Sequence, residues 1–116
     1  MGLRCKVFLI LALFIAVFIF YNSSLEKPYN PYPQKNIVPL TYHFGIFFLF
    51  SLFLFLAGKM NKESLFIVLL ISFVYAGLDE LHQYFVPGRF CSLSDFGIDG
   101  LGILASFVVV LFAVKK

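Results

Sequence analysis

The feature of this sequence that most constrains its fold is a series of four long apolar runs, separated by short polar or proline-containing segments. A bilayer core about 30 Å thick is crossed by roughly 20 helical residues, which is the scale of these runs. The chain is 61% hydrophobic and 13% charged over 116 residues. A soluble domain of this size could not bury so much apolar surface in one core. The sequence therefore predicts an integral membrane protein.

The predicted fold is all-α, a four-helix transmembrane bundle in a single domain over residues 1–116. We place the spans at about residues 7–21, 40–57, 64–84 and 95–114. The first run begins after basic residues but lacks a small-residue cleavage pattern, so we expect an uncleaved signal anchor. Four prolines in residues 22–39 predict an outer loop without regular helix between the first two spans. They are Pro28, Pro31, Pro33 and Pro39.

Charge placement predicts the orientation of the chain. With four spans, both termini and the turn at residues 58–63 share one side. That side carries six basic residues, Arg4, Lys6, Lys59, Lys62, Lys115 and Lys116, and the other side carries three, Lys27, Lys35 and Arg89. Cytoplasmic loops collect Lys and Arg, so we expect a multi-pass cell-membrane protein with both termini in the cytoplasm. The absence of a basic stripe argues against nucleic-acid binding, and Cys5 and Cys91, on opposite sides, are not expected to pair.

Polar and ionisable side chains gather at the predicted outer ends of the second, third and fourth spans. The set comprises His43, Asp79, Glu80, His82, Gln83, Arg89, Asp95 and Asp99. Charged groups at mid-bilayer depth cost roughly 2.5–3.5 kcal/mol each, so a functional role is the first hypothesis. Helical spacing places Asp79, His82 and Gln83 on one face and Asp95 and Asp99 one turn apart. Nearby glycines allow close helix contact, so we expect the carboxylates to face inward.

Structural roles remain open for several of these residues. Asp79 or Glu80 could form an ion pair with Arg89, and Asp95 could cap its helix. Histidines and carboxylates suit a divalent metal, but the HExxH spacing is absent, and Glu80 and His82 at i, i+2 point to different faces. We therefore predict neither a metal nor another cofactor.

Two other chemistries fit the placement of the cluster. A histidine beside a buried acid could act as a general acid or base, although no activated nucleophile is evident. We therefore leave enzymatic activity uncertain and assign no catalytic residue. Binding of a lipid headgroup accounts best for the position of the cluster at one face of the bilayer. Arg89 and His43 would hold a phosphate or carboxylate headgroup at the outer leaflet.

The segment from Leu78 to Arg89, LDELHQYFVPGR, together with Ser92–Asp95 and Gly102, resembles the signature of the VanZ-like membrane protein family. His43-Phe44 is similar to the family's His-Phe pair. The resemblance implies that the main site residues are His43, Glu80, Gln83, Arg89 and Asp95. Asp79, His82 and Asp99 are secondary candidates from their placement in the polar cluster. Pro39 and Leu40 replace the family's frequent Asp-Lys pair, and Asp99 replaces its Asn.

The family is named for a protein linked to teicoplanin resistance by an unestablished route, so the resemblance implies a role in the cell envelope. We predict binding of a polar lipid or an envelope lipid or glycan at the outward face. Replacing Glu80 with Gln should weaken that binding without unfolding the protein. The alternative is a membrane-embedded enzyme, metal-dependent or not, that acts on an envelope lipid headgroup with His43 or His82 as base. A third possible function is that of a purely structural subunit of a larger complex. The sequence leaves the oligomeric state open.

Overall fold

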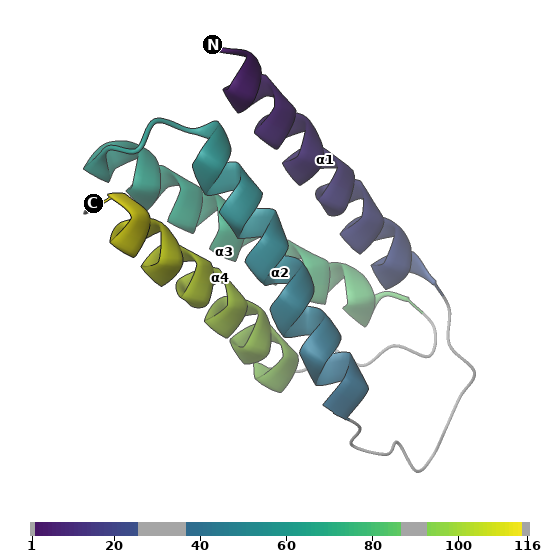
Figure 1. Cartoon of the computed structure of the whole chain (residues 1–116). Coiled ribbons are helices and arrows are strands. Elements are labelled where there is room, and N and C mark those ends of the chain that lie inside the picture. Colours follow the sequence, from purple (N-terminus) through teal and green to yellow (C-terminus); the bar gives the residue numbers. More distant parts are fainter. Residues whose placement is uncertain (1, 26–36, 87–92, 115–116) are drawn as a thin grey trace.

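The computed structural model describes residues 2–25, 37–86 and 93–114, and these form four helices with no strand among them. The helices are α1 (Leu3–Ser24), α2 (Ile37–Ala57), α3 (Lys62–Tyr84) and α4 (Leu93–Val114). They run up and down, so that the start of α1 and the end of α4 lie at the same end of the bundle (Figure 1). The all-α, four-helix fold class is thereby confirmed.

Length and composition agree with the membrane interpretation. The helices α1, α3 and α4 are each long and apolar enough to cross a bilayer, and α2 contains a shorter apolar helical stretch, Thr41–Ala57, within its full 21 residues. Large apolar side chains point away from the bundle on several helices, among them Phe14, Phe66 and Phe112, which are 75%, 66% and 67% exposed. Such an apolar outer surface suits contact with lipid rather than water.

The ends of two helices correct the predicted loop. α1 continues to Ser24 and α2 already begins at Ile37, so the expectation of no regular helix throughout residues 22–39 was wrong at both ends. Pro39 is the third residue of α2. Proline is tolerated in a first turn because the N–H groups there have no partner within the helix. At the opposite end of the bundle, the Asn61 side chain caps α3 by accepting a 2.8 Å hydrogen bond from the Ser64 N–H.

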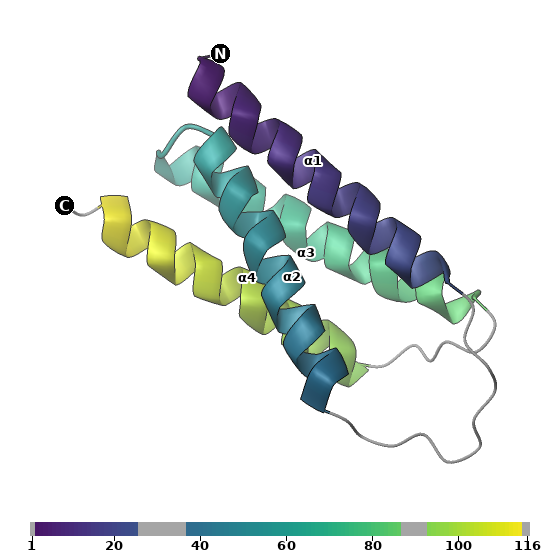
Figure 2. The same ribbon diagram turned by 45° about the vertical axis from the view of Figure 1, so that its right-hand side comes forward.

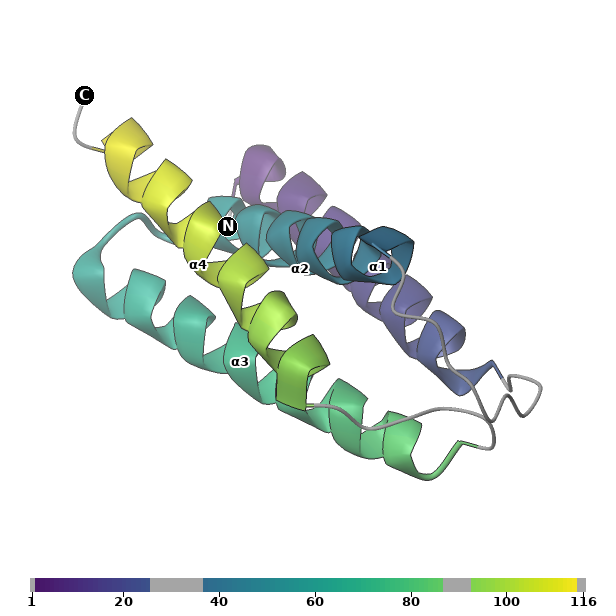
Figure 3. The same cartoon turned by 90° about the horizontal axis from the view of Figure 1, so that it is seen from below.

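α2 is the central helix of the bundle. It contacts the other three helices, whereas α1 and α4 do not touch each other within the described ranges. Figures 2 and 3 show α1 and α4 on different sides of α2. α4 approaches α2 closely at Gly102, where an added Cβ would collide with the Phe44 carbonyl oxygen and lie 3.2 Å from the Phe48 nitrogen. A glycine is required there because the two backbones touch.

The core has two apolar clusters along the bundle axis. One consists of Ile19, Phe47, Phe50, Ala76 and Ile103, and the other of Phe55, Leu65, Val68 and Val110. A buried hydrogen bond between the hydroxyls of Ser51 and Ser106 also joins α2 to α4. This packing fixes the rotation of the helices and so decides which polar side chains meet at the end opposite the chain termini.

Candidate functional site

The candidate site lies where α2 and α4 begin and where α1 and α3 end. His43 and Asp99 each lie six residues after the first residue of their helix, and Glu80 lies four residues before the last residue of α3. At about 1.5 Å of rise per residue, these side chains start roughly 6–9 Å inside the helix ends. The structure thus brings together three residues that are far apart in the sequence.

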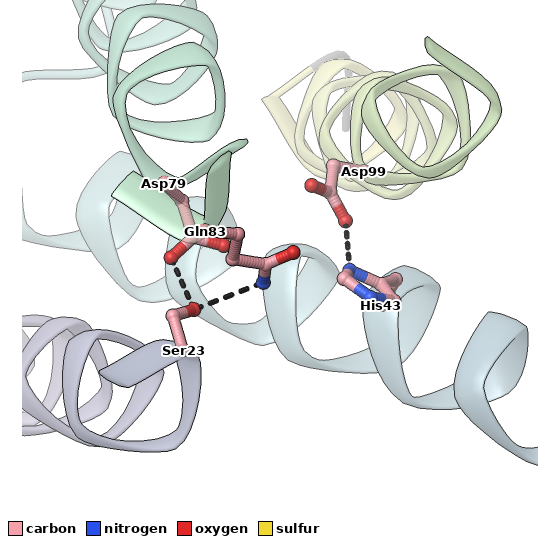
Figure 4. A network of polar contacts seen from close by, with 5 residues as sticks. All are labelled: Ser23, His43, Asp79, Gln83 and Asp99. Atoms are coloured by element: carbon pink, nitrogen blue, oxygen red, sulfur yellow. Dashed lines mark hydrogen bonds and ion pairs between the residues drawn. The ribbon is translucent and has the colours of Figure 1, made fainter. Parts of the chain in front are cut away.

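His43 and Asp99 form the central contact of the site. The His43 Nδ1 lies 2.8 Å from the Asp99 Oδ1, linking α2 to α4 (Figure 4). Asp99 is 0% exposed and His43 is 8% exposed. Glu80 of α3, 4% exposed, completes a group in which one donor atom from each residue lies within 4.8 Å of the others. We call His43, Glu80 and Asp99 the buried triad.

The second carboxylate oxygen of Asp99, Oδ2, is buried and has no hydrogen-bond partner among the residues that the structure describes. A buried polar atom without a partner costs roughly 1–3 kcal/mol, more when it is charged. The lysines and arginines with described side chains, Arg4, Lys6, Lys59 and Lys62, lie at the other end of the bundle. No lysine or arginine with a described side chain therefore lies at the triad.

A second polar cluster joins α1 to α3. The Ser23 hydroxyl donates a hydrogen bond to the Asp79 carboxylate and accepts one of 3.2 Å from the Gln83 amide (Figure 4). All three side chains are buried. The shared face predicted for Asp79, His82 and Gln83 therefore points toward α1.

His82 also contacts α1. Its Nε2 lies 2.8 Å from the Ser24 hydroxyl, and its ring stacks on Phe20 with centroids 4.5 Å apart. Since Glu80 faces the triad while His82 faces α1, the two side chains point to different faces, as their i, i+2 spacing indicates.

The structure divides the predicted residues between these two clusters. His43 and Glu80 meet in the triad with Asp99, which was only a secondary candidate. Gln83 lies instead beside Asp79 at α1, and Asp95, half-buried, lies in the first turn of α4. Arg89, with its predicted contact to Glu80, lies outside the described residues.

Sequence reasoning missed the contribution of α1. Phe20, Ser23 and Ser24 hold the polar end of α3, although the predicted site drew only on the other three helices. The only signal was the Ser23-Ser24 pair directly after the first apolar run, and two serines at a helix end are too common to indicate a site.

An apolar groove leads to the α1–α3 cluster. A cavity of about 190 Å³ is lined by Phe20, Tyr75, Leu78, Asp79 and His82. A second hollow of about 330 Å³ is lined by Leu70, Ile71, Val74, Tyr75 and Leu78. Because they share Tyr75 and Leu78, the two hollows adjoin along α3. We call them together the α3 groove, apolar for most of its length and polar at Asp79 and His82.

Comparison with known proteins places the chain in a family. No curated protein and no solved structure matches the sequence. The sequence model of the VanZ/LLP1 family matches residues 7–114. This range includes most of α1 and the whole of α2, α3 and α4, together with both polar clusters. The chain therefore belongs to the VanZ/LLP1 family, in agreement with the resemblance to VanZ-like proteins that its sequence motif carries.

Proposed function

We propose that this VanZ-like membrane protein binds the polar headgroup of a membrane lipid or cell-envelope lipid at the polar end of the α3 groove. The observation that carries the proposal is the groove itself, whose apolar walls end at Asp79 and His82. An amphiphile has the same division into an apolar chain and a polar head.

The apolar part of the α3 groove suits an acyl chain. Leu70, Ile71, Val74 and Leu78 are 47–57% exposed along one face of α3. α1 covers this face incompletely, since it touches α3 less extensively than it touches α2. A lipid chain lying there would contact protein on one side and bulk lipid on the other.

The polar part of the groove suits a headgroup that donates hydrogen bonds. Asp79 is a buried carboxylate, which only accepts hydrogen bonds when ionised and already accepts one from Ser23. The His82 ring lies beside it in the lining of the groove, with its Nε2 at the Ser24 hydroxyl. An ammonium or hydroxyl group is the complementary partner. We do not assign His43 to a phosphate, because its Nδ1 is held by Asp99.

We further propose that the polar end faces outward from the cell membrane, with both chain termini in the cytoplasm. The described basic side chains, Arg4, Lys6, Lys59 and Lys62, all lie at the opposite end. This distribution agrees with the positive-inside tendency of membrane proteins.

The headgroup proposal is tested with two lipids that differ by N-methylation of the headgroup, which removes its hydrogen-bond donors. Phosphatidylethanolamine has an ammonium with N–H groups, whereas phosphatidylcholine of the same acyl chains has none. Each is added in small excess to the purified protein in detergent micelles, where bilayer curvature does not contribute. We expect phosphatidylethanolamine to raise the Tm more, because ligand that binds the folded state stabilises it. A parallel titration with phosphatidylglycerol tests hydroxyl donors.

Variants locate the effect. Asp79→Asn removes the carboxylate charge and should abolish most of the difference between the two lipids. Glu63→Gln, the same type of change in the first turn of α3 at the opposite end, should leave it intact. Equal Tm shifts with all three lipids in the wild-type protein would refute the proposal.

A further inference from the structure

We propose that the buried triad of His43, Glu80 and Asp99 is a binding site for one divalent transition-metal ion. The site is separate from the α3 groove and does not depend on the proposed lipid function. Three helices supply one ligand each: His43 from α2, Glu80 from α3 and Asp99 from α4.

The geometry of the triad is close to that of a metal centre. Zinc binds imidazole nitrogen and carboxylate oxygen at about 2.0–2.2 Å, so two ligand atoms of one tetrahedral ion lie roughly 3.3–3.6 Å apart. In the triad the three donor atoms lie within 4.8 Å of one another, and His43 Nδ1 and Asp99 Oδ1 are 2.8 Å apart. Small changes in side-chain torsion angles would bring all three to one ion.

Asp99 provides a second, independent observation. Its side chain is 0% exposed, and its Oδ2 has no hydrogen-bond partner in the described ranges of the chain. Buried carboxylate oxygens are normally paired with donors or bound to metals. A metal ion in the triad would satisfy this carboxylate.

The charges of the triad also favour a dication. Metal ligation requires a neutral imidazole and ionised carboxylates, and in that state the triad carries a charge of about −2, which an ion of charge +2 would neutralise. Neutralisation matters because isolated charges in an apolar interior are very costly.

The donor set selects the class of metal. One imidazole nitrogen and two carboxylate oxygens suit Zn²⁺, Mn²⁺ or Fe²⁺, whereas Ca²⁺ takes 6–8 oxygen ligands. Three protein ligands leave at least one coordination position for water or another small ligand, as catalytic zinc sites do. Glu80 is part of the VanZ-like motif, so the triad and the motif share a residue.

The direct test is metal binding by the wild-type protein. Protein without a polyhistidine tag is purified in detergent, stripped with EDTA, and titrated with Zn²⁺ or Mn²⁺, with Mg²⁺ as comparison. We expect about one equivalent of Zn²⁺ or Mn²⁺ by elemental analysis and a rise in Tm that Mg²⁺ does not reproduce. Binding of Co²⁺ should give visible d–d absorption. No uptake of any of these ions by stripped wild-type protein would overturn the proposal.

Matched variants assign the ligands. Glu80→Gln and Asp99→Asn preserve side-chain size and should weaken metal affinity at least tenfold. His82→Gln and Glu63→Gln change the same residue types outside the triad and should retain wild-type affinity. Equal affinity in Asp99→Asn and wild type would also overturn the proposal. The Asp79→Asn variant keeps the triad intact. A failure of the lipid titrations therefore leaves the metal proposal standing, and a failure to bind metal leaves the lipid proposal standing.

Discussion

The imidazole of His43 and the carboxylate of Asp99 join α2 to α4 through a 2.8 Å contact near the place where Gly102 of α4 meets the backbone of α2. Phe44, the residue after His43, is the one whose carbonyl oxygen abuts Gly102. Asp99 and Gly102 are three residues apart and share a face of α4. The buried His43–Asp99 contact and the backbone contact at Gly102 therefore both stabilise the packing of α2 against α4.

The first prediction concerns the coupling between His43 and Asp99. Single His43→Ala and Asp99→Ala changes should each lower the free energy of unfolding, because each leaves the other polar group buried without this partner. The double variant should lose less than the sum, with a coupling energy of about 1–2 kcal/mol. Unfolding in mixed micelles containing EDTA measures the effect without bound metal. Additive losses would show that the two side chains do not interact.

The second prediction uses two glycines of α4. Gly102→Ala should destabilise the protein by about 1–3 kcal/mol, because the new methyl group would collide with the Phe44 carbonyl oxygen and force α2 and α4 apart. Gly97→Ala is the control, since a Cβ there meets no atom within 4 Å. It should be neutral or slightly stabilising, because alanine favours helix. Equal Tm values for the two variants would contradict the packing described here.

The third prediction separates a bonded serine from an unbonded one. Ser23→Ala removes hydrogen bonds to both Asp79 and Gln83 and should cost about 1–2 kcal/mol of stability. Ser72 is equally buried, but its hydroxyl has no hydrogen-bond partner in the described part of the chain. Ser72→Ala should therefore be neutral or stabilising. Thermal unfolding of the two variants in the same detergent is the comparison, and a larger loss in Ser72→Ala would refute the assignment.

The fourth prediction tests the orientation in the membrane. Green fluorescent protein fused after Lys116 should fluoresce, because it folds in the cytoplasm, where we expect the C-terminus to lie. Alkaline phosphatase fused at the same place should be inactive, because it requires an oxidising compartment for its disulfides. The opposite pair of results would place the polar end of the bundle in the cytoplasm.

Some features of the site followed from the helical period alone. The i, i+3, i+4 spacing of Asp79, His82 and Gln83 indicated one common face, and all three contact α1. The same reasoning separated Glu80 from His82. The period could not show which neighbouring helix each face meets, because that depends on how the helices rotate and pack.

Asp95 and Asp99 illustrate this limit. They lie one turn apart on the same face of α4, and nothing in their spacing indicates which one reaches His43. The close contact at Gly102 fixes the axial position of α4 relative to α2. At that position Asp99 lies opposite His43, while Asp95 is half-buried and nearer the helix end.

The sequence by itself determined the number of helices, their approximate ends and the gathering of polar residues at one end, because span length and charge position depend on local composition. Only the tertiary structure decided that these residues form two clusters and that α1 completes one of them. The physical reason is that lipid is as apolar as the bundle core, so hydrophobicity cannot distinguish the inner face of a membrane helix from its outer face. Close backbone contact at small residues such as Gly102 determines which face of each helix points into the bundle.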